Sequence, residues 1–142
     1  MLVDSNILVY SINRRSAKHV AAKNFLQNKA GDLKIAHQNI FETLRILTHP
    51  KFPSPMKVSE ALKAIDNILK SCKVISPNEK TYHITFLLIK ENRVRSDLIF
   101  DAYLAATALS NGISVIATDN TRDFKKFKQI KIINPFLQTH QN

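Results

Sequence analysis

Hydrophobic residues recur along the chain with two spacings, one typical of short buried strands and one typical of amphipathic helices. The strand-like runs are short and largely apolar, and they lie at residues 1–3, 33–36, 74–76, 113–117 and 131–133. Segments with helical spacing lie between them, at residues 6–12, 16–28, 37–47, 58–72, 79–89 and 97–110. Strands that alternate with helices favour an α/β fold, so we predict a Rossmann-like domain with a mostly parallel central sheet of four to five strands flanked by helices.

The chain has the length of one ordinary domain, and we expect a single domain over residues 1–142. Prolines at positions 50, 53 and 55 predict a loop within that domain. No apolar run approaches the roughly 20 residues of a membrane-spanning helix, and the N-terminus lacks the basic region of a secretory signal. Cys72 is the only cysteine, which fits a reducing compartment, so we expect a cytoplasmic protein.

The charge of the chain is strongly unbalanced, with 21 Lys and Arg against 11 Asp and Glu and a formal net charge of +10. Such an excess attracts polyanions, because neutralised phosphates release counterions. Nucleic acid is therefore the expected partner. The alternative is a basic surface that serves only solubility, and charge alone does not separate the two.

Three of the few acidic residues lie in apolar surroundings: Asp4 between MLV and ILVY, Glu42 within IFETL and Asp101 within LIFDAYLAA. A buried carboxylate is costly unless it pairs with a base, takes up a proton or binds a cation. Asp97 lies four residues before Asp101 on one predicted helix face, where like charges repel unless a positive charge is near. Oxygen ligands without a cysteine cluster favour Mg²⁺ or Mn²⁺ over zinc.

Each acid also has a simpler interpretation, as a cap at a strand end, a helix-surface acid or an acid in the first turn of a helix. The sheet adds a spatial argument, because sites in open parallel sheets lie at the carboxyl ends of the strands. Asp4 and Thr118 follow two predicted strands, so we expect both at that edge.

Four motifs in order make the interpretation specific. The segment DSNILVY at residues 4–10 resembles the opening motif of PIN-domain nucleases, particularly the VapC-type toxins. FETLRILT around Glu42, DAYLAA from Asp101 and the segment from Thr118 to Asp123-Phe124 resemble the three later motifs of that family. The likeness extends from Met1 to about Ile133.

The resemblance implies a metal-dependent endoribonuclease with catalytic, metal-binding acids at Asp4, Glu42, Asp101 and Asp123. Supporting polar residues are expected at Thr118, Asn120, Asn6, Asp97 and Asp119. The implied products carry 5′-phosphate and 3′-hydroxyl ends. The resemblance also implies a VapBC-type toxin that forms a homodimer and is repressed by a cognate antitoxin in the acidic groove.

Basic groups should surround such a site to attract the phosphates of single-stranded or looped RNA. The candidates are Arg14, Arg15, Arg45, Arg93, Arg95 and Arg122, joined by Lys125, Lys126 and Lys128. Tyr10 and Phe52 are candidates for base stacking, although aromatic residues are more often part of the core.

Other functions fit the residues less well. A haloacid-dehalogenase-like phosphatase needs a second aspartate two residues after Asp4, where Asn6 stands. A dinucleotide-binding protein needs a glycine-rich turn after its first strand, and the only glycines are Gly31 and Gly112. A housekeeping PIN-type RNA-processing nuclease and a catalytically silent RNA-binding module remain as alternatives.

Overall fold

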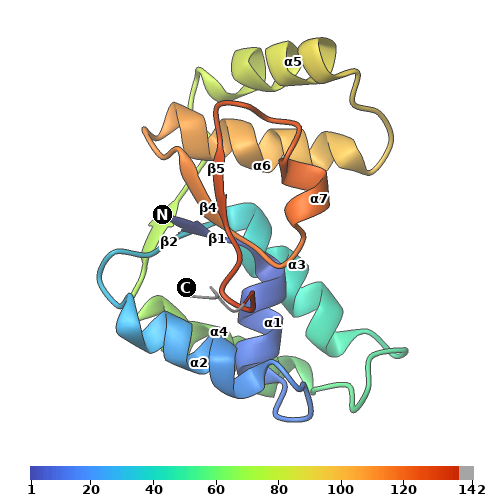
Figure 1. Ribbon diagram of the computed structural model, residues 1–142. Coiled ribbons are helices and arrows are strands. Elements are labelled where there is room, and N and C mark those ends of the chain that lie inside the picture. Colours follow the sequence, from blue (N-terminus) through green and yellow to red (C-terminus); the bar gives the residue numbers. More distant parts are fainter. Residues whose placement is uncertain (138–142) are drawn as a thin grey trace.

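The computed structural model describes residues 1–137, and residues 138–142 of the expected domain lie outside the described part. Its strands are β1 (Leu2–Val3), β2 (Lys34–Ala36), β3 (Lys73–Ile75), β4 (Val115–Ala117) and β5 (Lys131–Ile133). Its helices are α1 (Ser5–Ile12), α2 (His19–Asn28), α3 (His37–Thr48), α4 (Val58–Leu69), α5 (Thr81–Asn92), α6 (Leu98–Ser110) and α7 (Thr121–Phe124). The predicted α/β class and the alternation of strands and helices are confirmed (Figure 1).

The five strands form one sheet in the order β3-β2-β1-β4-β5, and every neighbouring pair is parallel. The first strand therefore lies in the middle, between β2 and β4, and the chain order reverses there. Val3 of β1 is in register with Ala117 of β4. The residues that follow these two strands, Asp4 and Thr118, consequently lie side by side at the carboxyl edge, as expected.

The two faces of the sheet bury different side chains, because alternate residues of a strand point to opposite sides. Leu2 and Ile116 pack into the cluster that contains α5 and α6, whereas Val3 and Ala117 pack into the cluster of α1 and α2. A smaller cluster joins α1, α3 and α4 around Leu47. Helices thus cover both faces of the sheet, which explains why its short strands are almost entirely apolar (Figure 1).

Several helices differ from the predicted ones, including α5, which spans Thr81–Asn92 where residues 79–89 were predicted. Residues 16–18 form a turn before α2, because the Ser16 hydroxyl oxygen accepts the backbone N–H of Lys18 at 3.1 Å. Helix α4 ends at Leu69 rather than at Cys72, since the chain turns there to enter β3. The short helix α7 was not predicted, because four residues are too few to establish a helical spacing.

The predicted loop around the three prolines is confirmed, and it connects α3 to α4. Gly112, with φ of 73°, follows the end of α6, where a glycine adopts the left-handed conformation without strain. Within residues 1–137, no helix is both long enough and apolar enough to cross a membrane.

Candidate active site

Asp4 occupies the junction between β1 and α1, where its side chain is almost fully buried. Its Oδ1 accepts the backbone N–H of Ser5 at 2.8 Å, which caps α1, so the simpler interpretation of this residue as a cap is also true. Its Oδ2 accepts the Thr118 hydroxyl at 2.6 Å and the Asn6 amide at 3.0 Å. These groups are all neutral. Burial raises the pKa of Asp4, and hydrogen bonds from Thr118 and Ser5 oppose that shift.

Glu42 reaches the same edge of the sheet from α3. Its Oε2 accepts the Ser5 hydroxyl at 3.0 Å, and its Oε1 accepts the Gln38 amide at 2.9 Å. The Ser5 hydroxyl also lies 3.4 Å from Oδ1 of Asp4. The Ser5 hydroxyl therefore lies between the carboxylate of Asp4, after β1, and that of Glu42, on α3.

Asp101 lies in the first turn of α6 and is half-buried. Burial, followed by the negative charges of Asp123, Asp4 and Glu42, raises the pKa of Asp101 to about 6. The nearby Lys126 ammonium opposes this shift. A carboxyl whose pKa is raised by three other acids shows that all four motif acids share one electrostatic site.

Asp123 comes from α7, the helix that the hydrophobic pattern missed. Its Oδ2 accepts the Asn120 amide at 2.6 Å. The Asn120 backbone N–H in turn donates to the Thr118 hydroxyl oxygen at 2.9 Å. Thr118, Asn120 and Asp123 therefore form a hydrogen-bonded segment after β4, beside Asp4.

Three further residues contact the acids and were not singled out in the sequence: Ser5, Gln38 and Asn39. Asn39 is fully buried, and its amide nitrogen lies 3.5 Å from Oδ1 of Asp4. The strand-end argument that predicted Asp4 and Thr118 applies equally to β2, whose last residue, Ala36, donates its N–H to Asn39 at 3.1 Å. That rule, extended to a third strand, would have found Gln38 and Asn39.

Asp97 and Asp119 have different surroundings. Asp97 precedes α6 and is exposed. The largest Coulombic effects on Asp101 come from Asp123, Asp4 and Glu42, and the repulsion expected between Asp97 and Asp101 stays a prediction. Asp119 forms an ion pair with Lys18.

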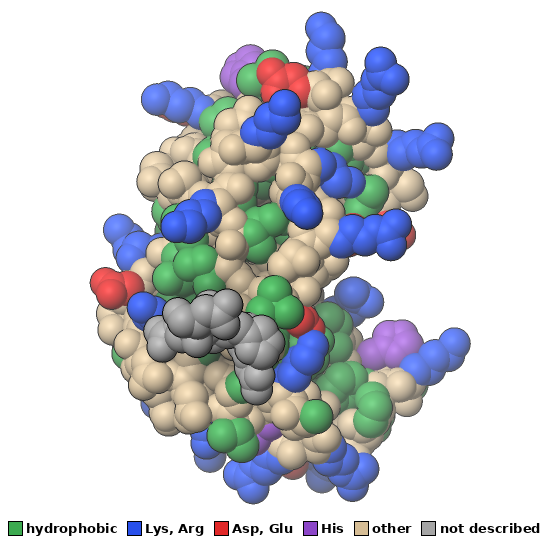
Figure 2. Space-filling model, in the orientation of Figure 1, with side chains coloured by type: hydrophobic (Ala, Val, Ile, Leu, Met, Phe, Trp, Pro, Cys, Tyr) green, Lys and Arg blue, Asp and Glu red, His purple; other side chains and the backbone are tan. Residues whose placement is uncertain are grey.

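The predicted basic residues are spread over several surfaces. Arg45, Arg93, Arg95 and Arg122 are exposed. Lys and Arg side chains are distributed widely over the face in Figure 2, among few acids. Arg14 and Arg15 follow α1 at the end remote from Asp4, about 12 Å away along an eight-residue helix. They do not lie beside the acids, and the basic residue that acts on Asp101 is Lys126.

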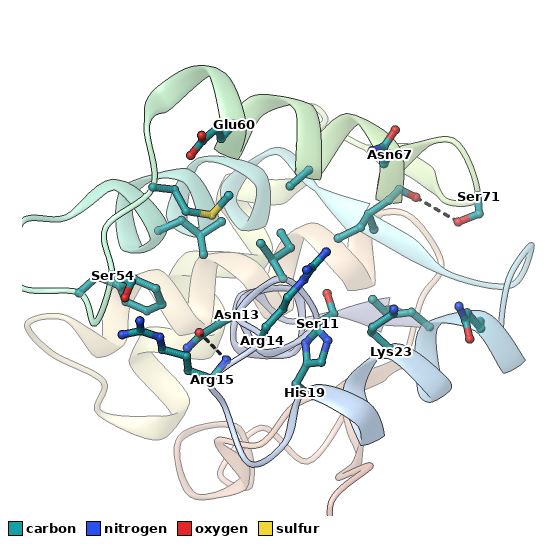
Figure 3. A pocket seen from close by; sticks show the side chains of 18 of the residues that line it. Ser11, Asn13, Arg14, Arg15, His19, Lys23, Ser54, Glu60, Asn67 and Ser71 are labelled. Carbon is teal, nitrogen blue, oxygen red and sulfur yellow. Dashed lines mark hydrogen bonds between the residues drawn. The ribbon is translucent and has the colours of Figure 1, made fainter.

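Arg14 and Arg15 line a groove with a volume of about 1120 Å³. Figure 3 shows them with His19 and Lys23 on one side and Glu60 and Asn67 of α4 on the other. The apolar lining of the groove includes Ile12, Leu47, Phe52, Met56 and Ala64. Phe52, considered above for base stacking, is therefore part of this groove and not of the acidic site.

The acidic site has the chemistry of a hard divalent cation site, since its ligands would all be oxygen atoms. Within residues 1–137, no three acidic, His or Cys side chains are arranged to hold a metal ion. The carboxylates instead accept hydrogen bonds from Thr118, Gln38 and Asn120, as their mutual repulsion favours. These hydrogen-bond partners are neutral, so they do not cancel the negative charge of the carboxylates. The carboxylate oxygens therefore fit Mg²⁺ or Mn²⁺ as ligands.

Comparison with known proteins agrees with this geometry. The model of the PIN domain family matches residues 1–130. The chain belongs to the PIN-domain family. Ribonuclease VapC24 of Mycobacterium tuberculosis is 27% identical over 137 residues, which cover 94% of each chain. VapC ribonuclease Mb2897 of Mycobacterium bovis is 26% identical over 147 residues, which cover 99% of each.

Solved structures share the same PIN fold. VapBC2 from Rickettsia felis, bound to a DNA fragment from its promoter, superposes with a TM-score of 0.73 at 19% identity, covering 94% of this chain and 96% of that one. VapC20 of Mycobacterium tuberculosis, described as a toxin that cleaves the sarcin-ricin loop, gives a TM-score of 0.67 at 16% identity, covering 87% and 92%. At these identities, the likeness concerns the fold.

Proposed function

We propose that this PIN-domain protein is an endoribonuclease that depends on Mg²⁺ or Mn²⁺ and acts as the toxin of a VapBC-type toxin–antitoxin pair. The observation that carries the proposal is the series of hydrogen bonds that links Asp4 to Glu42 through Ser5 and to Asp123 through Thr118 and Asn120. The raised pKa of Asp101 supports the proposal. Relatives named as VapC ribonucleases over nearly the full chain support the choice of RNA as substrate. We propose that the protein acts in the cytoplasm, because its proposed substrate, RNA, and its proposed repressor, the antitoxin, would both be met there.

Asp4, Glu42, Asp101 and Asp123 are the residues that would hold the cation. When bound, the cation supplies positive charge at the phosphodiester and a water nucleophile with a lowered pKa. Asp4 is held by its hydrogen bonds from Thr118, Asn6 and Ser5, so it would present a fixed carboxylate. Burial and neighbouring acids raise the pKa of Asp101 to about 6, which suits this carboxyl to exchange a proton with water near that pH.

Positive groups around the acids would bind the substrate phosphates flanking the cleaved bond. Lys126 lies close enough to act on the charge of Asp101, and Arg122 is adjacent to Asp123 in α7. Arg45 lies in the last turn of α3, the helix that carries Glu42. Exposed side chains at these positions suit contacts with the phosphate backbone, which contribute affinity without reading sequence.

We propose that the antitoxin occupies the acidic groove, as the family resemblance implies, and that it also contacts the groove between α1, α2 and α4. An apolar floor with a basic rim suits an amphipathic segment that carries acidic side chains. We also propose the homodimer implied by the family resemblance. Phe41 and Phe100 are 66% and 61% exposed, and large exposed aromatic side chains favour a contact surface for a second copy.

The decisive experiment incubates the purified protein with labelled single-stranded and hairpin RNAs in Mg²⁺, Mn²⁺ or EDTA. We expect cleavage with either ion, 5′-phosphate products and no cleavage in EDTA. Asp101→Asn should abolish cleavage, while Asp66→Asn, at an exposed position of α4, serves as the matched control. Cleavage in EDTA, or full activity of Asp101→Asn, would overturn the proposal. RNA binding without cleavage would favour the silent RNA-binding module.

A further inference from the structure

Asp119 stands apart from the other acids at the carboxyl edge, because positive and polar side chains surround it. Its Oδ2 accepts hydrogen bonds from the Lys18 ammonium and, at 3.0 Å, from the Tyr10 hydroxyl. Its Oδ1 accepts the Asn134 amide at 3.3 Å. Burial raises the pKa of Asp119, but the hydrogen bonds from Lys18, Tyr10 and Asn134 outweigh this and lower it below its usual value. Asp119 therefore carries a charge that is already compensated.

Lys18 is held in place from several sides. It lies in the turn that delays the start of α2, and the ST-type hydrogen bond of Ser16 shapes this turn. Its ammonium lies 5.3 Å from the centre of the Tyr10 ring and 5.2 Å from that of Phe136, within the range of cation–π attraction. The two rings meet edge to face at 5.5 Å, where the chain after β5 passes α1 (Figure 1). Lys18 thus contacts three separate segments: α1 through Tyr10, the segment after β4 through Asp119, and the segment after β5 through Phe136.

The backbone of Asp119 connects this cluster to the acidic site. Its N–H donates to Oδ1 of Asn6 at 3.1 Å. The amide nitrogen of the same Asn6 donates to Oδ2 of Asp4 at 3.0 Å and to the Thr118 hydroxyl oxygen at 3.1 Å. Asn6 can satisfy all three contacts only while the segment after β4 keeps its present distance from α1.

We infer that Asp119 is a positioning residue and not a metal ligand: its ion pair with Lys18 and its hydrogen bond from Tyr10 fasten the segment after β4 to the turn before α2 and to α1, and through Asn6 it orients Asp4 and Thr118. The inference rests on the nuclease function proposed for the same site. One observation separates Asp119 from the ligand acids: donors from Lys18, Tyr10 and Asn134 occupy both of its carboxylate oxygens.

The first test separates turnover from substrate binding. In Asp119→Asn and in Lys18→Met, we expect kcat to fall about tenfold with KM within about twofold, because small displacements of reacting groups reduce the rate more than affinity. The double variant should be no slower than the slower single variant, since both remove one shared contact. Lys18→Arg keeps the charge and should recover most of kcat, and Asp66→Asn is the control.

The second test counts bound ions without RNA, by titration of Mn²⁺ followed by electron paramagnetic resonance. Asp119→Asn should bind as many ions as the wild-type protein, while Asp101→Asn should bind fewer or bind more weakly. Loss of an ion in Asp119→Asn alone, with Lys18→Met at wild-type kcat, would make Asp119 a ligand and overturn the inference. Wild-type kcat in both Asp119→Asn and Lys18→Met would overturn it as well.

A third measurement does not depend on nuclease activity. The Asp119 backbone N–H should exchange with solvent at least about tenfold faster in Lys18→Met than in the wild-type protein, because its acceptor Asn6 is no longer held in place. Lys18 has a side chain that is 42% exposed, so this variant should keep its fold, which circular dichroism would verify. If the wild-type protein does not cleave RNA, the proposed function fails, and unchanged exchange would separately overturn the positioning role.

Discussion

Two regions at opposite ends of α1 differ in both shape and charge. At its N-terminal end, carboxylates from α3, α6 and α7 meet beside the buried Asp4, with neutral hydrogen-bond donors around them. At its C-terminal end lies the groove, with an apolar floor and the side chains of Arg14, Arg15 and Lys23. The comparison shows that charge distinguishes the two regions. Four acids with neutral hydrogen-bond donors favour a bound cation, whereas an apolar groove favours an apolar segment of a partner.

The largest effect is expected from Asp4→Asn, which removes a charge from the acidic end of α1. RNA cleavage in Mg²⁺ should fall by a factor on the order of 10²–10³, as for the loss of one preorganised electrostatic group. The melting temperature should not fall, because an amide is less costly to bury than a carboxylate whose pKa burial has raised. Single-turnover cleavage and thermal unfolding, with Asp66→Asn as the control, measure both. Near-wild-type cleavage by Asp4→Asn would contradict the assignment of this end.

A smaller effect is expected from charge reversal at the other end of α1. Arg14→Glu with Arg15→Glu should weaken retention of the antitoxin by about ten- to a hundredfold, because like charges would then face its acidic side chains. Cleavage of RNA by the free protein should remain at least about a third of wild type, since phosphate contacts are individually modest. Co-expression with the protein of the adjoining reading frame, followed by a pull-down at several salt concentrations, tests this. A parallel loss of cleavage would show that the two regions are not separate.

The smallest effect concerns the coupling within the acidic end. The carboxyl of Asp101 should titrate near pH 6, and Asp123→Asn should move that midpoint down by about half to one pH unit, because one repelling charge is gone. Carbon NMR of the side chain, recorded without divalent ions, reads the midpoint directly. Asp97→Asn should move it less, and equal shifts in both variants would contradict the specific coupling.

The same pKa has a consequence for stability. Between about pH 4 and 6, the folded protein without divalent ions binds more protons at Asp101 than the unfolded chain does. Its free energy of unfolding should therefore fall as the pH rises through this window. Urea titrations at several pH values measure the trend, which Asp101→Asn should reduce.

The hydrophobic pattern predicted the sheet and most helices because each element is long enough to show its own spacing. Helix α7, with four residues, carries no such signal, although it places Asp123. The strand-end rule found Asp4 and Thr118, and it would have found Asn39 had it been applied to β2. The arginines were harder to place, because an exposed basic residue has no periodic or motif signature that says which surface it faces.

By itself, the sequence determined the alternation of strands and helices and the presence of four acids in ordered motifs, since both are properties of neighbouring residues. Only the tertiary structure decided which charges act on one another. It brought Asp101 near Asp123, Asp4 and Glu42, paired Asp119 with Lys18, and placed Arg14 at the remote end of α1. Coulombic interaction and burial depend on distance through space and on the solvent excluded around each group, and neither quantity follows from separation along the chain.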